Sequence, residues 1–118
     1  MIQHLTPDIV FKCLADETRA RMTLLIAREG ELCVCELTAA LDESQPKVSR
    51  HLSQLRGCAI LEDRRHGQWV YYRLHPHLPD WVHDMLKVVL GANRKWLSPD
   101  IERLERMRDQ PKRASVCG

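Results

Sequence analysis

The sequence lacks the features that mark several common classes of protein. No apolar run approaches the roughly 20 residues that cross a bilayer, and the opening segment, MIQHLTPDIVFK, does not join a basic start to an apolar stretch as a signal peptide does. There is no CxxC pair, no phosphate-binding loop after a strand, and no grouping of His, Asp and a nucleophile on short loops. We therefore expect a cytoplasmic protein that has no membrane partner and is not an enzyme.

The length of the chain sets a limit on the size of its core. A chain of 118 residues with 44% hydrophobic content predicts one domain with a modest core. A domain of this size gains stability by burying a further face in an oligomer. We expect residues 1–110 to form the domain and residues 111–118 to form a flexible C-terminal tail.

Positive charge is scarce overall but concentrated in one region. The formal net charge is only +2, yet residues 44–73 contain six Lys or Arg against two acidic residues, a local net charge of +4. The rest of the chain must then sum to −2. A basic region of this kind is typical of a surface that binds nucleic acid.

The pattern along the chain predicts mainly helical structure with one β-hairpin. Asp16 and Ser44 are candidate N-caps, Gly30 is a candidate helix end, and Gly67 favours a hairpin turn. Pro99 is expected to break the chain. The expected helices are 7–15, 17–29, 34–41, 45–57, a long helix from 79 to 97, and 101–109, and the expected strands are 59–64 and 68–74.

The order of these elements indicates a winged helix-turn-helix. Two short helices joined by a tight turn precede a basic hairpin. In the fourth helix Val48, Leu52 and Leu55 recur at helical spacing and are expected to face the core. A polar helix face and a basic hairpin tip can contact the bases and phosphates of double-stranded operator DNA. The expected DNA-binding residues are Ser44, Gln45, Lys47, Ser49, Arg50, His51, Gln54, Arg64, Arg65, His66 and Gln68.

An apolar stripe follows one side of the long helix. Its spacing is helical, and the four preceding helices already make a small core. We therefore expect this stripe to pack on a second copy, giving a homodimer through the terminal helices that reads a pseudo-palindromic operator. The stripe consists of Trp81, Met85, Val88, Val89, Ala92 and Trp96.

Two cysteines stand one residue apart in ELCVCEL, residues 31–37. Cys33 and Cys35 lie beside Glu31 and Glu36, and the pair could be core filler, a redox pair or metal ligands. In a cytoplasmic protein we do not expect the five cysteines to form structural disulfides. An odd number of cysteines with one CxC pair favours a thiol site plus scattered thiols.

Three segments together resemble the ArsR/SmtB family of metalloregulatory repressors, in its arsenic-responsive branch. They are FKCLADETRARMTLL, GELCVCELTAALDESQPKVSRHLSQLR and EDRRHGQWVYYRLHPHLPDW. The resemblance implies a homodimeric repressor that binds its operator until trivalent arsenic or antimony releases it. It implies that Cys33 and Cys35 bind this inducer and that DNA contacts lie on residues 44–56 and on the wing, with no cofactor required.

The sequence departs from the pattern C-V-C-[DE]-L-C of the most similar relatives. Thr38 stands where a third cysteine is expected, and a soft ion such as trivalent arsenic prefers sulfur ligands. Solvent or an exogenous thiol can complete the set. Otherwise the candidate third ligand is Cys117, and Cys13 or Cys58 is less favoured because both fit a core thiol better. The choice among arsenite, antimonite and methylated arsenicals stays open.

The spacing of the pair suggests how an inducer would act. Residues two apart in a regular helix point about 200° apart, so both thiolates reach one ion only if the helix start unwinds. We expect that distortion to shift the helix-turn-helix pair and to favour the DNA-free state. Since the effects of two ligands are reciprocal, operator DNA should then weaken the affinity for the metalloid by the same factor.

Other functions remain alternatives. One is a redox-sensing repressor of the same fold, in which Cys33 and Cys35, or Cys13, oxidise. Another is a zinc-responsive repressor, although the histidines near the long helix, His75, His77 and His83, do not show the zinc-binding arrangement of related sensors. A thiol enzyme and an adaptor that uses the winged fold for protein contacts are less favoured.

Overall fold

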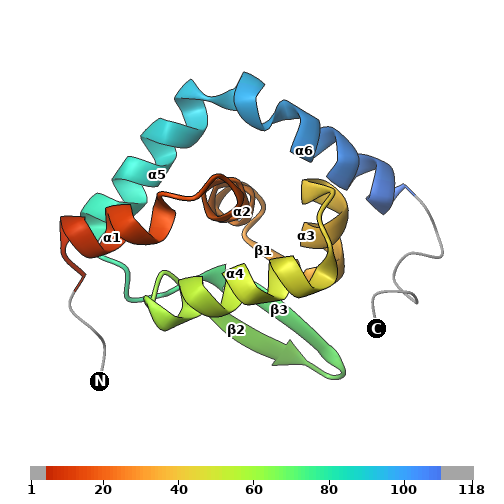
Figure 1. The fold of residues 1–118 in the computed structure, drawn as a ribbon, viewed down its shortest axis with the longest axis horizontal. Coiled ribbons are helices and arrows are strands. Elements are labelled where there is room, and N and C mark those ends of the chain that lie inside the picture. Colours follow the sequence, from red (N-terminus) through yellow and green to blue (C-terminus); the bar gives the residue numbers. More distant parts are fainter. Residues whose placement is uncertain (1–4, 110–118) are drawn as a thin grey trace.

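The computed structural model describes residues 5–109, which form mostly helices around a small sheet. In Figure 1, α2 lies near the centre of the view, α5 and α6 arch over one side, and α4 and the β2–β3 hairpin lie on the opposite side. Across residues 5–109, no helix is both long and apolar enough to cross a membrane. The N-terminal four residues and the predicted tail, residues 111–118, lie outside the described part of the chain.

The first four helices follow the caps that the sequence predicts. Asp16 accepts a hydrogen bond from the backbone N–H of Arg19 at the start of α2, and Ser44 accepts one from Lys47 at the start of α4. Gly30 ends α2 with a φ of +93°, which a residue with a side chain rarely adopts. The bounds are α1 Pro7–Leu14, α2 Glu17–Glu29, α3 Val34–Leu41 and α4 Gln45–Gly57.

The hairpin gains a third strand that the sequence did not predict. The strands are β1 Glu31–Cys33, β2 Leu61–His66 and β3 Trp69–Leu74, and their order in the sheet is β1-β3-β2. All neighbours are antiparallel, with Cys33 opposite Tyr71 and Leu61 opposite Leu74. Gly67, at a φ of +63°, makes the predicted turn. Cys33 is therefore attached to the wing through β1.

The prediction of one long helix broken at Pro99 is wrong. The helix α5 is Asp80–Ala92, the break falls at Asn93, and α6 is Arg94–Arg108 with Pro99 inside it. Contacts on both sides of Pro99 override its tendency to end a helix. Arg21 of α2 donates one hydrogen bond to the carbonyl of Trp96 and another to the carboxylate of Asp100.

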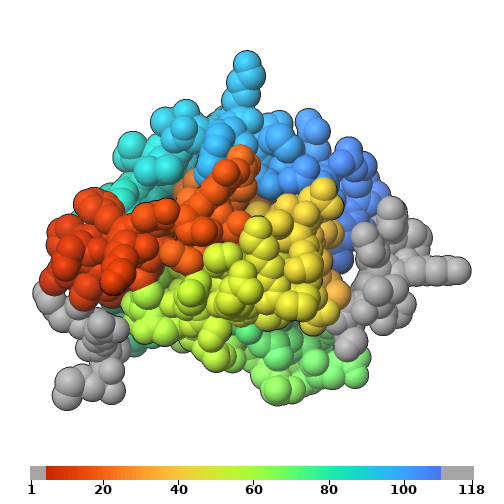
Figure 2. Space-filling model, viewed as in Figure 1, coloured from red at the N-terminus to blue at the C-terminus, as the bar shows by residue number. Residues whose placement is uncertain are grey.

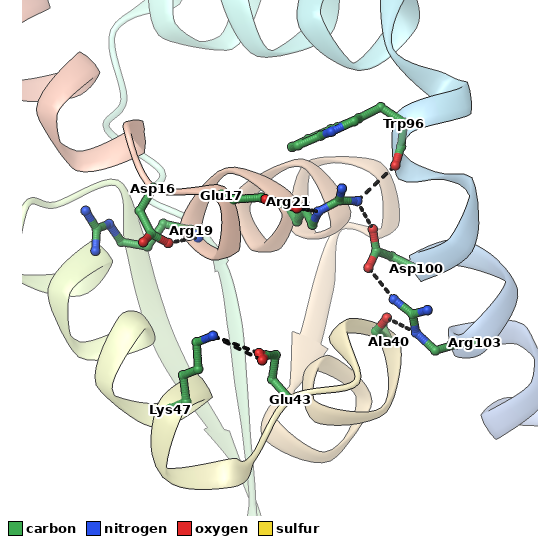
Figure 3. A network of polar contacts seen from close by, with 10 residues as sticks. All are labelled: Asp16, Glu17, Arg19, Arg21, Ala40, Glu43, Lys47, Trp96, Asp100 and Arg103. Carbon is green, nitrogen blue, oxygen red and sulfur yellow. Dashed lines mark hydrogen bonds and ion pairs between the residues drawn. The ribbon is translucent and has the colours of Figure 1, made fainter.

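A buried carboxylate fixes α6 to the rest of the fold. Asp100 is buried and accepts hydrogen bonds from Arg21 at 2.6 Å and from Arg103 at 2.8 Å. Arg103 also donates to the carbonyl of Ala40 in α3, and the Arg21 guanidinium lies over the ring of Trp96 (Figure 3). These contacts join α2, α3 and α6 at one point.

The core lies between α2 and the elements that surround it. Its fully buried side chains include Met22, Leu25 and Ile26 from α2 and Leu52 and Leu55 from α4. The inward face predicted for the fourth helix is thus confirmed. The helix-turn-helix formed by α3 and α4, followed by the β2–β3 wing, confirms the predicted winged helix-turn-helix fold.

Candidate nucleic-acid interface and inducer site

The helix α4 exposes a polar face at its N-terminal half. Ser44, Gln45, Ser49 and Arg50 are exposed, while Val48 beneath them is fully buried. No acidic residue stands in the first turn of α4. In the space-filling view, the surface of α3 and α4 (yellow to yellow-green) lies beside that of the hairpin (green), as Figure 2 shows. Ser53, which the sequence analysis did not select, is also exposed on α4.

Two expected DNA contacts on α4 already have protein partners. Lys47 is half-buried, and its ammonium group binds both carboxylate oxygens of Glu43 at 2.8 and 3.0 Å (Figure 3). The side-chain oxygen of Gln54 accepts a hydrogen bond from Arg19 at 2.7 Å. Both side chains remain near the surface, but DNA would have to compete with these partners for them.

The expectation that His51 contacts DNA does not fit its position. The residue is only 6% exposed, because its side chain faces α2 rather than solvent. Nδ1 lies 3.2 Å from the Arg19 guanidinium, and Nε2 lies 4.0 Å from the carboxylate of Asp16. His51 therefore acts in holding α4 against the start of α2.

Arg19 links α4 to the rest of the fold, a role that the sequence did not predict. Its guanidinium donates to the carbonyl of Cys13 at 2.7 Å and to Gln54 at 2.7 Å, and it contacts His51. It thereby joins the end of α1 and the start of α2 to the exposed helix α4. A cation two residues after a capped helix start is too common a pattern to reveal this contact from sequence.

The tip of the wing presents the predicted cationic residues to solvent. Arg64, Arg65, His66 and Gln68 are all exposed. The imidazole of His66 packs edge-on against the ring of Tyr71 on the adjacent strand, with ring centroids 5.7 Å apart. The tip therefore combines exposed polar groups with a defined strand geometry behind them, and Arg64 among them lies 3.9 Å from the carboxylate of Glu31.

Cys33 and Cys35 stand on either side of the start of α3. Cys33 is the last residue of β1 and the N-cap of α3, with an extended backbone and a side chain 6% exposed. Cys35 is half-buried in the first turn, and both residues carry thiols. Since Cys33 lies outside the helix, the 200° separation expected for two residues of one helix does not apply to the pair.

Glu36 organises this helix start. It forms a capping box with Cys33, in which the backbone N–H of Cys33 donates to Glu36 Oε1 at 3.0 Å. The other oxygen of Glu36 accepts a hydrogen bond from Arg108 in the last turn of α6 at 3.2 Å. The sequence signal was present, since Cys33 and Glu36 have the spacing of a capping box with Cys in place of Ser or Thr.

Arg108 also binds Glu29 at the end of α2. Its guanidinium donates to Glu29 Oε1 at 2.7 Å. Burial alone would raise the pKa of Glu29, but the hydrogen bond and charge of Arg108 outweigh it and hold that pKa below its ordinary value. The C-terminal end of α6 is thereby fixed beside the cysteine pair.

The remaining cysteines in the described region are paired with each other. Cys13, at the end of α1, and Cys58, at the C-cap of α4, form a disulfide. The expectation of no structural disulfide is therefore wrong, and neither sulfur is available to complete a site at Cys33 and Cys35. Cys13 belongs to the buried core, and Cys58 packs against it.

A complete metal-binding set is not assembled within residues 5–109, where no three His, Cys, Asp or Glu side chains converge. His75 and His77 lie in a turn with their rings 5.7 Å apart, and His83 lies on α5. Cys33 and Cys35 thus need at least one further ligand to hold a three-coordinate ion. The candidate Cys117 lies outside the described residues.

The apolar stripe of α5 is largely exposed. Val88 is 69% exposed, Trp81 and Val89 of α5 are exposed as well, and Trp96, which the predicted stripe included, is exposed on α6. Phe11 of α1, 56% exposed, adds to this surface. An apolar groove of about 250 Å³ lies between α1, α2 and α5, and it is lined by Phe11, Leu14, Ala20, Thr23, Leu24, Met85, Leu86 and Val89. The buried hydroxyl of Thr23 has no hydrogen-bond partner among the described residues.

Comparisons with known proteins agree with this fold. A family model described as bacterial regulatory protein, arsR family, matches residues 16–63. The chain is 68% identical over 117 residues to the arsenic resistance transcriptional regulator ArsR1 of Pseudomonas putida KT2440, with 99% of this chain and 91% of that protein covered. It is 42% identical over 116 residues to the arsenical resistance operon repressor of Escherichia coli K12, covering 98% and 99%.

A solved structure resembles the chain as well. It is the solution structure of the homodimeric winged helix-turn-helix DNA-binding domain Mb0332 from Mycobacterium bovis, described as a possible ArsR-family transcriptional regulator. The TM-score is 0.61 at 27% identity, covering 76% of this chain and 80% of that one. The matched family region, residues 16–63, contains the cysteine pair, α3, α4 and the first residues of the wing.

Proposed function

The chain belongs to the arsR family of bacterial regulatory proteins, and we propose that it is a metalloid-responsive transcriptional repressor. It binds operator DNA as a dimer and leaves the DNA when trivalent arsenic binds Cys33 and Cys35. One observation carries this proposal. The two thiols stand at the start of α3, which directly precedes the exposed polar helix α4. The relatives named for arsenic resistance support arsenic as the inducer.

Operator binding is assigned to the N-terminal half of α4 and to the wing. Gln45, Ser49 and Arg50 are exposed donors that a major groove can accept, and Arg64 and Arg65 are positioned for phosphates beside it. His51 is left out of this assignment because it is buried, and the other predicted contacts are proposed to support binding: Ser44, Lys47, Gln54, His66 and Gln68. A repressor that acts on operator DNA works in the cytoplasm of a bacterium.

Dimer formation is assigned to the exposed surface of α1 and α5. Phe11, Trp81 and Val88 are large apolar side chains that a second copy would cover. The homodimeric domain from M. bovis supports this assembly. The dimer presents one α4 helix to each half-site.

The inducer site needs a third ligand, and Cys117 of the same chain is the strongest candidate. Cys13 and Cys58 are bonded to each other, and Arg108 fixes the end of α6 to Glu36 beside the site. Cys117 follows Arg108 by nine residues, a span that can reach about 30 Å when extended. Arsenous acid, As(OH)3, would bind three thiols as As(SR)3 with loss of three waters.

Operator titration with arsenite tests this assignment. The wild-type dimer should bind a DNA fragment carrying its operator and leave it as arsenite is added, in a fluorescence anisotropy assay. Cys117→Ser should require at least about tenfold more arsenite for half-release, a difference of about 1.4 kcal/mol. Unchanged sensitivity would assign the third position to solvent or an exogenous thiol. Antimonite and methylarsenite in the same assay establish the order of inducers.

Redox sensing is a second candidate function, favoured by the Cys13–Cys58 disulfide. This bond ties α1 to the C-terminal end of α4. Hydrogen peroxide would form it from two thiols with release of two waters. If redox state controls the protein, operator affinity differs between peroxide and dithiothreitol and the difference disappears in Cys13→Ser/Cys58→Ser. If metalloid binding controls it, operator binding persists in peroxide and is lost in arsenite.

A further inference from the structure

The three-stranded sheet places the inducer cysteine and a wing cation on one line of paired residues. Cys33 of β1 is opposite Tyr71 of β3, and Tyr71 is opposite Arg64 of β2. Neighbouring strands in a sheet lie about 4.8 Å apart, so Cys33 and Arg64 are two strand spacings apart. The same residue that would hold the metalloid is therefore joined by backbone pairing to the part of the wing that would hold DNA.

The strand β1 is short and is attached mainly to β3. It contains only Glu31, Leu32 and Cys33, and each of these pairs with β3. Glu31 adds an ion pair with Arg64 across the sheet at 3.9 Å. Leu32 is fully buried and anchors the middle of the strand. Cys33, at the end of β1, is also the N-cap of α3, so a movement of Cys33 would act on both elements.

Metalloid binding acts on that end. Cys33 has an extended backbone, whereas Cys35 is already in the first turn of α3. The thiol of Cys33 is engaged in the capping box with Glu36. In the proposed step, binding one ion together with Cys35 draws Cys33 out of this cap and toward the helix. A strand residue that turns in this way changes its pairing with the opposite strand.

We propose that Cys33 positions the wing as well as binding the inducer, and that the wing carries most of the loss of DNA affinity. Metalloid binding displaces Cys33 from Tyr71, and β3 and β2 then shift Arg64 away from the phosphate backbone. This inference rests on the proposed function, and it differs from a mechanism in which α3 simply moves α4. The pairing of Cys33, Tyr71 and Arg64 is the observation that carries it.

The coupling between arsenite and operator tests the proposal. The quantity measured is the ratio of operator dissociation constants with and without saturating arsenite. In Arg64→Ala/Arg65→Ala the wing contacts are absent before arsenite is added. Arsenite should therefore raise the operator dissociation constant of this variant by a smaller factor. We expect the ratio to fall at least about tenfold below that of the wild type.

Arg50→Ala is the matched control, since it removes an exposed cation from α4 and leaves the wing intact. It should weaken operator binding in both states by a similar factor and keep the ratio within about twofold of the wild type. Arsenite binding by each variant is confirmed separately from the ultraviolet absorbance of arsenic–thiolate bonds. A wing variant whose ratio stays within about twofold of the wild type would overturn the proposal.

Hydrogen exchange supplies a second measurement that involves no DNA. Arsenite should increase exchange at the backbone amides of residues 31–33 and 69–74 in the wild type and leave them unchanged in Cys35→Ser. Unchanged exchange in a wild-type protein that does leave its operator would also contradict the proposal. Failure of arsenite to release the operator at all would instead contradict the proposed function, so the two failures are distinguishable.

Discussion

At the scale of single residues, the helix caps show how local chemistry sets the position of the candidate site. Asp16 starts the helix that carries Arg19, and Arg19 holds α4 through Gln54 and His51. Cys33 starts α3 with Glu36. Each cap was readable from the sequence, but the long-range contacts of Arg19 and Glu36 were not, because they depend on how the helices pack.

Replacing Asp16 with Ala should destabilise the protein by about 1 kcal/mol, since the backbone N–H of Arg19 loses its acceptor. Urea denaturation measures the change, and Glu102→Ala, exposed on α6, is the control. The hydrogen bond from Arg19 lowers the pKa of Asp16 from the ordinary 3.8. The stabilisation is therefore complete above pH 3.8 and is lost as the pH falls through the lower value. An equal effect of Asp16→Ala at pH 7 and at pH 2 would contradict this account.

The positions of Arg50 and His51 predict different effects of two adjacent substitutions on operator binding and its salt dependence. Arg50→Gln should weaken operator binding at least about tenfold and reduce its salt dependence, because an exposed cation facing DNA is lost. His51→Gln should leave the salt dependence unchanged, because His51 is buried against α2. Operator titrations between 50 and 200 mM salt, as a rough working range, measure both. A reduced salt slope for His51→Gln would place its imidazole at the DNA.

At the scale of elements, the sequence predicted most boundaries and missed two features for physical reasons. The helices α1 to α4 match their predicted ranges closely, because capping residues and glycine mark their ends. The strand β1 is only three residues long, and its pairing depends on the distant β3. Pro99 lies inside α6 because Arg21 and Asp100 stabilise the helix around it.

The attachment of α6 depends on Asp100. Asp100→Ala leaves Arg21 and Arg103 without the buried carboxylate that binds both. We expect a loss of about 3 kcal/mol in the free energy of unfolding, measured by urea denaturation. Glu102→Ala on the same helix should have an effect within about 0.5 kcal/mol. A similarly small effect of Asp100→Ala would show that the two arginines find other partners.

At the scale of the whole molecule, the sequence predicted a protomer that leaves one apolar surface uncovered until a second copy packs on it. The stripe predicted on α5 is exposed at Trp81, Val88 and Val89. Phe11 and the groove beside Thr23 emerged only from the packing of α1 against α2 and α5. The inducer site was likewise predicted only in part. The motif identified the cysteine pair, but the link through β1 to the wing depends on the sheet register.

Val88→Glu should convert the dimer to a monomer, because it places a carboxylate on the surface that a second copy covers. Sedimentation velocity measures the assembly state, and circular dichroism checks that the helices persist. Operator affinity should fall at least about a hundredfold, since one α4 reads only one half-site. Lys87→Glu, an exposed change of charge on the same helix, is the control. A dimeric Val88→Glu protein would assign the interface to another surface.

The central claim is that Cys33 and Cys35 convert metalloid binding into release of DNA. The most direct test is an arsenite titration of operator-bound protein, comparing the wild type with Cys33→Ser/Cys35→Ser. Both proteins should bind the operator with similar affinity before arsenite is added, because neither side chain lies on the exposed face of α4 or on the wing. Arsenite should then release the wild type and leave the variant bound. Release of the double variant at the same arsenite concentration would contradict the account.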